Sequence, residues 1–283
     1  MLRTLALTVA YDGTDWVGFQ RQPVLPSIQR VLETALTGVL RHEVRIAAAG
    51  RTDAGVHALG QIISLQTPNP LPLERLPRAI NLSLPKSIRV LRAEERPADF
   101  NARLSALYRR YWYLLQVTRR TDPVRGRYCW QLPQALDATA MQDALHPLVG
   151  RHDFAAFCNG GDQRKQAKGT IRTLQHARVR SWAGCLVVDI QADSFVHRMV
   201  RLLVSNLVIV GSGERPVSWL ETLLHSGDRP LAGASAPPNG LILMKIGYPP
   251  ITYTSHSGEE VGVLNDENIP GKSAGSRTPV AAD

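Results

Sequence analysis

Cysteine is scarce in this sequence, and long apolar runs are absent. The three cysteines, Cys129, Cys158 and Cys185, are odd in number and widely spaced, which argues against a disulfide framework or a zinc knuckle. No apolar run approaches the ~20 residues that a membrane-spanning helix needs. The first residues also lack the basic-then-apolar pattern of a signal peptide. We therefore expect a soluble, cytoplasmic protein with no membrane partner.

Motifs that bind metals or nucleotides are missing as well. The chain contains no HExxH, GxSxG or GxGxxG motif and no EF-hand loop, and its eight histidines do not cluster at ligand spacing. The sequence therefore predicts no metal and no cofactor.

Positive charge, in contrast, is plentiful. The 283 residues include 33 Lys and Arg against 24 Asp and Glu, a formal net charge of +9. Such an excess favours a polyanionic partner, with nucleic acid the first candidate and an anionic membrane surface the second. The membrane surface fits less well, because no expected helix is strongly amphipathic with a Lys-rich polar face.

The stretch GRTDAGVHA, residues 50–58, has the composition of an active-site loop. Asp53 lies between two glycines, with Arg51 and His57 close by and short β-prone stretches on either side. A P-loop is excluded because Val56 and His57 stand where Lys and Ser/Thr are required. Two alternatives remain: a reactive carboxylate held between two strands, or an ordinary turn whose Asp bonds to its own backbone.

The first part of the chain, residues 1–105, predicts an α+β unit. Periodicity gives the order strand, helix, strand, strand, helix, strand, which is that of a ferredoxin-like (RRM-like) unit. The expected elements span residues 2–11, 27–40, 44–49, 59–66, 73–82 and 88–95.

Residues 106–249 predict a second α+β unit, and residues 250–283 a disordered tail. The expected elements of the second unit span residues 107–117, 137–149, 173–182, 185–192, 195–210, 216–226 and 241–248. Beyond Pro249 the chain is polar and aperiodic, so it cannot bury enough apolar surface to fold. The predicted fold class is α+β, with two ferredoxin-like units whose antiparallel sheets join around a central catalytic cleft.

Two segments mix aromatic, amide and cationic side chains, a mixture typical of surfaces that stack on bases and hold phosphates. The first is DWVGFQRQ, which includes Gln20 and Arg21. The second is the strand RRYWY, whose alternation puts Arg109, Tyr111 and Tyr113 on one face. Each segment could instead be ordinary packing, a loop in the first case and a core strand in the second.

The expected helix over residues 195–210 is apolar on nearly its whole circumference. His197, Arg201 and Ser205 draw one polar stripe along it at a spacing of four. An arginine in such a helix needs an anionic partner, because an uncompensated buried charge costs several kcal/mol. The partner could belong to a functional site or to a structural salt bridge.

These stretches together resemble the tRNA pseudouridine synthase A family. The shared motifs are YDG…GxQxQ, GRTDAGVHA, RRYWY, FVHRMVR and GLIL, in the family's order between about Leu5 and Tyr248. The resemblance implies that Asp53 is the catalytic aspartate and that Arg201 pairs with it. It also implies that Tyr111 contacts the target base and that Leu241 packs beneath that base.

The same resemblance implies an isomerase with the pseudouridine synthase fold. Its substrate would be uridine on the 3′ side of the tRNA anticodon stem-loop, and it would be a homodimer in which one tRNA touches both subunits. We expect further substrate contacts from Arg51, His197, Gln20 and Arg21. Asp53 could attack covalently or remove a sugar proton, with Arg201 favouring its ionised form, and the sequence does not decide between these routes.

This chain departs from the family pattern at two positions. The family usually has Asn after the helix arginine and Gly three residues later, where this chain has Leu202 and Ser205.

The competing hypothesis is a non-catalytic RNA-binding protein of two ferredoxin-like modules. It accounts for the charge and the aromatics, but not for the Asp53 loop together with an arginine on an apolar helix, and no clear RNP1 motif is present.

Overall fold

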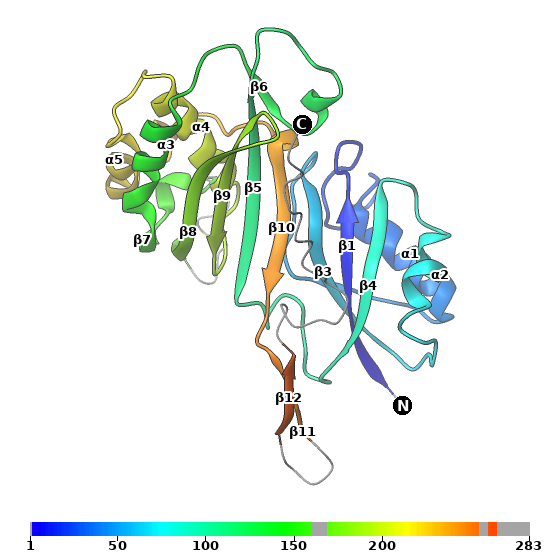
Figure 1. The fold of residues 1–283 in the computed structure, drawn as a ribbon. Coiled ribbons are helices and arrows are strands. Elements are labelled where there is room, and N and C mark those ends of the chain that lie inside the picture. Colours follow the sequence, from blue (N-terminus) through cyan, green and yellow to red (C-terminus); the bar gives the residue numbers. More distant parts are fainter. Residues whose placement is uncertain (1, 160–168, 255–259, 265–283) are drawn as a thin grey trace, which may run out of the picture. The chain divides into compact units, whose positions relative to one another are not determined.

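The computed structural model describes residues 2–159, 169–254 and 260–264. The chain divides into two compact units, Met1–Gly247 and Tyr248–Asp283. All of the predicted site residues lie in the first unit, which combines helices with one large sheet (Figure 1).

A ten-stranded mixed sheet runs through the first unit. Its main path has the order β4 (Ile88–Arg96), β1 (Arg3–Tyr11), β3 (His57–Thr67), β10 (Leu241–Gly247), β5 (Tyr108–Val117), β9 (Cys185–Ala192), β8 (Ile171–Trp182) and β7 (Gly150–Asp153). Beside this path, β2 (Ala47–Ala48) pairs with β3 and β6 (Trp130–Leu132) pairs with β5.

The predicted α+β class is confirmed, but in place of two antiparallel sheets one mixed sheet spans both halves of the unit. The strand responsible is β10, which lies parallel to β3 and antiparallel to β5; β6 is also parallel to β5. Gly60 permits the close approach of β10, since a Cβ there would overlap the backbone carbonyl of Met244. Local periodicity predicts strands but carries no information about such a long-range pairing.

Helices lie toward the two ends of the sheet (Figure 1). α1 (Ile28–Leu40) and α2 (Leu76–Asn81) accompany β1 and β4, and α1 buries the predicted apolar stripe that includes Leu32 and Leu36. α3 (Ala138–Leu145), α4 (Met199–Gly211) and α5 (Trp219–Ser226) gather near β8 and β9. Short 3-10 turns occur at η1 (Arg125–Arg127), η2 (His146–Leu148), η3 (Ala155–Phe157), η4 (Pro230–Ala232) and η5 (Pro238–Gly240).

α4 is buried on almost every side, as the sequence predicted, but it begins four residues later than expected. All of its residues except Ile209 are buried. Arg198 precedes the helix in a left-handed conformation, with φ 61°, so the segment 195–198 is not helical. His197 therefore lies before the helix and does not share the polar stripe with Arg201.

The segment after Pro249 also differs from the prediction. β11 (Ile251–Thr254) and β12 (Glu260–Leu264) form an antiparallel pair, so the expected disorder over residues 250–283 is wrong for these two stretches. The rest of that prediction, residues 255–259 and 265–283, lies outside the described residues.

Candidate active site

Asp53 lies on a tight turn between β2 and β3. The N–H of Val56 donates to the carbonyl oxygen of Asp53 at 3.2 Å, and Gly55 takes a φ of +76°. Glycine favours this backbone conformation, and a Cβ at Gly55 would also press on the ring of Pro238. The predicted loop between two strands is present, with Asp53 at the first position of the turn.

Hydrogen bonds from the N-terminal segment hold this turn in place. The N–H of Phe19 donates to the carbonyl of Thr52 at 3.0 Å, and the N–H of Gly55 donates to the carbonyl of Trp16 at 3.3 Å. The Thr52 hydroxyl also lies 2.8 Å from the phenol oxygen of Tyr11. A loop fixed at several backbone positions can hold a carboxylate in one orientation.

Arg201 of α4 pairs with Asp53. Its Nη1 lies 3.1 Å from Asp53 Oδ2, and its Nε donates to the carbonyl of Ala236 at 2.7 Å. The Arg201 side chain is 11% exposed and the Asp53 side chain 30% exposed, so the pair is partly desolvated. A guanidinium among apolar residues needs such partners. The polar stripe led us to expect an anionic partner for Arg201, and Asp53 occupies that position.

Two further basic groups approach Asp53 from the segment before α4. His197 Nε2 lies 3.5 Å from Asp53 Oδ1, and Arg198 Nε lies 3.9 Å from Oδ2. Arg198 and Arg201 together give the carboxylate a cationic surrounding, and His197 adds an imidazole nitrogen within reach. Arg198 was missed by the sequence analysis, because helix periodicity put it beside the polar stripe and gave no sign of its left-handed backbone.

Tyr111 of β5 lies beside Gly50, at the start of the loop of Asp53. The residue is 8% exposed, and its ring meets Phe195 edge to face with centroids 5.2 Å apart. Its hydroxyl lies 3.7 Å from the position a Cβ on Gly50 would take. Burial raises the pKa of Tyr111 well above its usual range, and the charge of Asp53 acts in the same direction. The phenol is therefore held in its neutral form.

Leu241 begins β10 beside the same strand. In the β5–β10 register it stands opposite Tyr113, whereas Leu243 stands opposite Tyr111. Because alternate residues share a face, both leucines lie on the face of Tyr111. Leu241 is 7% exposed, and its place under a target base stays a prediction.

Most of this chain is similar in sequence to a protein family and to individual proteins of known name. A family model described as tRNA pseudouridine synthase matches residues 7–104 and 144–249. This chain belongs to the tRNA pseudouridine synthase family. The tRNA pseudouridine synthase A of Pseudoalteromonas atlantica is 40% identical over 245 residues, which cover 87% of this chain and 92% of that protein. The protein of the same name from Frankia casuarinae is 42% identical over 249 residues, 87% of this chain and 89% of its own length.

The family model includes some of the predicted site residues and skips one. Asp53, Arg201 and Leu241 fall within the matched ranges, whereas Tyr111 falls between them. The assignment of Tyr111 therefore rests on the RRYWY motif and on its position beside Gly50, at the start of the loop of Asp53.

Three of the substrate contacts expected from the synthase family are solvent-exposed. The side chains of Gln20, Arg21 and Arg51 all face solvent. Arg21 Nε lies 3.5 Å from Oε2 of Glu33, whose side chain is 4% exposed, so this guanidinium is partly held in place. A role in substrate binding stays a prediction for all three.

The aromatic residues of the same N-terminal segment serve packing. Trp16 Nε1 donates to the Ser87 hydroxyl at 3.2 Å, and Phe19 is 1% exposed. The alternative of a packed loop therefore describes these two rings better than base stacking does.

The two departures from the synthase family pattern lie inside α4. Leu202 is fully buried, and its carbonyl accepts hydrogen bonds from the Ser205 hydroxyl at 3.0 Å and from Asn206 Nδ2 at 2.9 Å. The hydroxyl of Ser205 is thus satisfied within the helix, and Arg201 still reaches Asp53.

Arg109 is a supporting residue whose role the sequence did not reveal. Its Nε and Nη2 donate to the carbonyl of Ala49 at 3.2 and 2.8 Å, and its Nη1 donates to the carbonyl of Asp193 at 2.8 Å. Ala49 precedes the loop of Asp53, and Asp193 precedes the segment of His197. One guanidinium thus links both parts of the synthase site. Strand alternation predicted only that Arg109 lies on the same face of the strand as Tyr111.

The site offers acid–base and nucleophilic groups. Among residues 2–159, 169–254 and 260–264, no group of three or more His, Cys, Asp or Glu residues could hold a metal ion. In the same part of the chain no helix is both long enough and apolar enough to cross a membrane. The carboxylate of Asp53 is partly exposed and lies beside the fixed guanidinium of Arg201, with the neutral phenol of Tyr111 nearby. This carboxylate can act as nucleophile or base.

Proposed function

We propose that this protein isomerises uridine to pseudouridine in tRNA, with Asp53 as the catalytic carboxylate. The observation that carries the proposal is the geometry of Asp53, a 30% exposed carboxylate on a fixed turn, 3.1 Å from Nη1 of the nearly buried Arg201. Membership of the tRNA pseudouridine synthase family supports the same activity. The reaction breaks the N1–C1′ bond, turns the detached ring and joins C5 to C1′; C5 releases its proton and N1 takes one up, with no net oxidation.

Each of the three central residues has a separate task in this proposal. Asp53 either attacks the sugar or base covalently or removes a sugar proton, and both routes remain open. Arg201 holds the carboxylate in place and compensates its charge while substrate excludes water. Tyr111 stacks on the uracil and is a candidate for moving the C5 proton.

The substrate would be the 3′ side of the tRNA anticodon stem-loop. A paired or stacked uridine must leave its helix to reach Asp53, at a cost of about a few kcal/mol that stacking and phosphate contacts offset. The net charge of +9 favours those contacts. We assign them to Gln20, Arg21, Arg51 and His197, with Leu241 beneath the base. Since tRNA is a cytoplasmic substrate, the activity implies a cytoplasmic location.

The proposal extends to architecture and assembly. Residues 1–105 and 106–249 would be two ferredoxin-like units around the cleft of Asp53, in a pseudouridine synthase fold. The order β4, β1, β3, with β2 on β3, supports this for the first unit. The active form would be a homodimer in which one tRNA touches both subunits.

Turnover of unmodified tRNA tests the function. Transcripts labelled with tritium at C5 of uridine should release tritium with the wild-type protein, because C5 loses its proton when it bonds to C1′. Asp53→Asn should release none while still binding tRNA, since the amide keeps the shape but is neither base nor nucleophile. Residual turnover of Asp53→Asn within about tenfold of wild type would contradict the role of Asp53. Wild-type binding without any release would favour the non-catalytic RNA-binding protein instead.

A further inference from the structure

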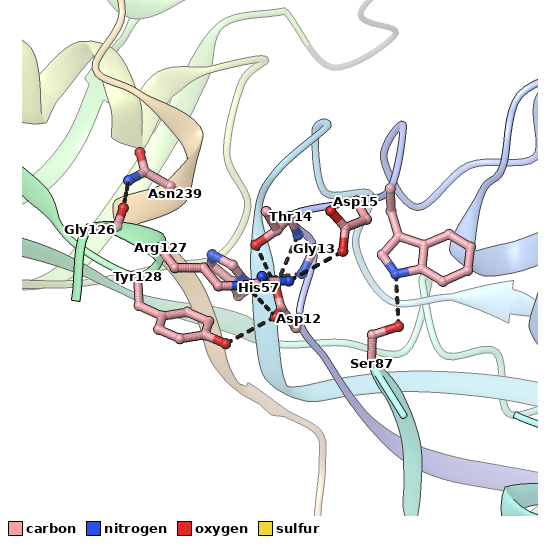
Figure 2. Close-up of polar contacts among 11 residues, drawn as sticks. Asp12, Gly13, Thr14, Asp15, His57, Ser87, Gly126, Arg127, Tyr128 and Asn239 are labelled. Atoms are coloured by element: carbon pink, nitrogen blue, oxygen red, sulfur yellow. Dashed lines mark hydrogen bonds and ion pairs between the residues drawn. The ribbon is translucent and has the colours of Figure 1, made fainter. Parts of the chain in front are cut away.

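Asp12 is the centre of a polar cluster beside the loop of Asp53 (Figure 2). Its carboxylate accepts hydrogen bonds from the N–H and hydroxyl of Thr14 at 3.0 and 2.6 Å. It also accepts from Arg127 Nε at 2.9 Å and from the Tyr128 hydroxyl at 3.0 Å. Thr14 belongs to the same turn, whereas Arg127 lies 115 positions away in the connection between β5 and β6. One carboxylate thus ties two distant segments together.

His57, the first residue of β3, lies against this cluster. The residue is 4% exposed, and its Nδ1 accepts a hydrogen bond from the N–H of Gly13 at 3.0 Å. The same nitrogen lies 3.3 Å from Asp12 Oδ1, and the ring packs on Tyr128 with centroids 5.1 Å apart. Burial lowers the pKa of His57, which agrees with a neutral ring whose Nδ1 can accept.

The backbone of Gly13 packs against the turn that carries Asp53. A Cβ at Gly13 would overlap the carbonyl group of Val56, so the two backbones touch at this point. His57 follows Val56 in the chain and accepts the N–H of Gly13. A shift of the Asp12 turn is therefore passed on to the backbone next to Asp53.

The Arg127 segment is a firm anchor because it is held from a second side. Asn239 Nδ2 donates to the carbonyls of Gly126 at 2.7 Å and Cys129 at 3.0 Å, and Figure 2 shows the first of these contacts. Asn239 stands just before β10. The segment is thus fixed both to the Asp12 turn and to the strand that joins the halves of the sheet.

We propose that Asp12 is a positioning residue for catalysis: it ties its own turn to Arg127 and so holds Gly13, whose N–H binds His57, against the turn of Asp53. The inference rests on the proposed function, because the turn matters for catalysis only if Asp53 is catalytic. Asp12 acts through the loop and does not touch the reacting atoms.

An exposed ion pair alone does not explain this arrangement, and Asp15 shows the difference. Asp15 lies in the same turn and accepts from Arg127 Nη2 at 3.2 Å, but its side chain is 77% exposed. Asp12 is 21% exposed and lies against His57. Partial burial raises the pKa of Asp12, but the hydrogen bonds from Thr14 and Tyr128 act in the opposite direction, and on balance the pKa is lowered to about 2. The carboxylate is therefore charged throughout the physiological range.

Asp12→Asn tests the proposal, with Asp15→Asn as the matched control. Asparagine keeps the size of the side chain and an oxygen for Thr14, but it removes the charge that faces Arg127. We expect kcat for pseudouridine formation to fall about 10- to 100-fold while KM changes by less than about threefold, since misplaced groups weaken the transition state more than binding. Asp15→Asn should stay within about twofold of wild type, because exposed ion pairs contribute little.

Hydrogen exchange of the peptide covering residues 50–58 gives a readout that does not depend on activity. The amides of Gly55 and Val56 should exchange faster in Asp12→Asn than in wild type, and at the wild-type rate in Asp15→Asn. Unchanged exchange in Asp12→Asn, equal effects of the two variants, or a loss confined to KM would overturn the proposal. A wild-type protein without turnover contradicts the proposed function instead, and the exchange rates then still decide whether Asp12 holds the loop.

Two more variants test the roles of Arg127 and His57 separately. Arg127→Met removes the distant partner of Asp12 from a side chain that is 40% exposed, so it tests the anchor even where Asp12→Asn does not fold. It should reproduce the faster exchange and part of the loss in kcat. His57→Asn keeps an acceptor for the N–H of Gly13, and adding Asp12→Asn to it should cost much less than Asp12→Asn alone. Fully additive losses would show that Asp12 does not act through His57.

Discussion

Arg201 Nη1 lies 3.1 Å from Asp53 Oδ2, although the two residues are 148 positions apart in the chain. Asp53 comes from a turn between β2 and β3, and Arg201 comes from α4, so the pair requires both halves of the first unit. The carbonyl of Ala236 binds Nε of the same guanidinium. A planar guanidinium held at two positions presents its remaining donors in a fixed direction.

Substitution of Arg201 should therefore damage catalysis more than folding. Arg201→Met fills the volume of the arginine stem but leaves Asp53 without its main cation, and we expect kcat/KM to fall about 10- to 100-fold, as for other hydrogen bonds to charged groups. Arg201→Lys should recover little, because one ammonium cannot reach Asp53 and Ala236 in the same geometry. Kinetics and thermal melts of both variants decide this. Wild-type kcat/KM in Arg201→Met would remove Arg201 from the active site.

Two substitutions of Tyr111 separate stacking from proton transfer. Tyr111→Phe keeps the ring and its edge-to-face contact with Phe195, so tRNA binding should be preserved. Tyr111→Leu loses the stacking surface, at a typical cost of ~1–3 kcal/mol per base. If the hydroxyl moves the C5 proton, both variants lose turnover, which single-turnover measurements will show. An active Tyr111→Phe variant limits Tyr111 to stacking.

The stability of the protein should fall as the pH drops below about 6.5, and His57 should contribute to the fall. Burial lowers the pKa of His57 in the folded state, so the unfolded chain binds the proton at higher pH than the folded one. The stabilisation is then complete above the unfolded value and is lost as pH falls toward the folded value. Melting temperatures between pH 8 and pH 5 should drop less in His57→Asn. A residual slope is expected, since burial also lowers the pKa of His176.

Removal of the second unit should leave the site intact. A chain cut after Pro249 retains the whole unit Met1–Gly247, including β10 and all of the predicted site residues. We expect tritium release and tRNA affinity close to those of the full chain, with affinity falling steeply as salt rises, because phosphate contacts release counterions. A truncated protein that melts normally but has lost activity would show that the unit after Gly247 contributes to the reaction.

The sequence predicted the local elements well because their signals are local. The strand that contains Tyr111 was expected at residues 107–117 and lies at Tyr108–Val117. The apolar stripe of α1 and the turn of Asp53 were likewise present in the pattern of neighbouring residues. The partner of Arg201 was within reach of sequence reasoning for a different reason, since a buried charge on an apolar helix demands an anion.

What the sequence did not predict depends on contacts between distant segments. Arg109 reads as one cation on an aromatic strand, yet it binds the carbonyls of Ala49 and Asp193 on either side of the site. Asp12 reads as a turn residue, and nothing in its neighbourhood indicates Arg127. Arg198 approaches Asp53 only because its backbone leaves the helical region. None of these contacts has a periodic or compositional signal.

The position of β10 sets the time during synthesis at which this protein can become active. β10 is the last strand of its sheet to be made, yet it pairs with both β3 and β5. Before residues 241–247 leave the ribosome, the half that carries Asp53 and the half that carries Arg201 have no strand between them. The nascent chain therefore holds an incomplete active site until the whole of the first unit has been translated.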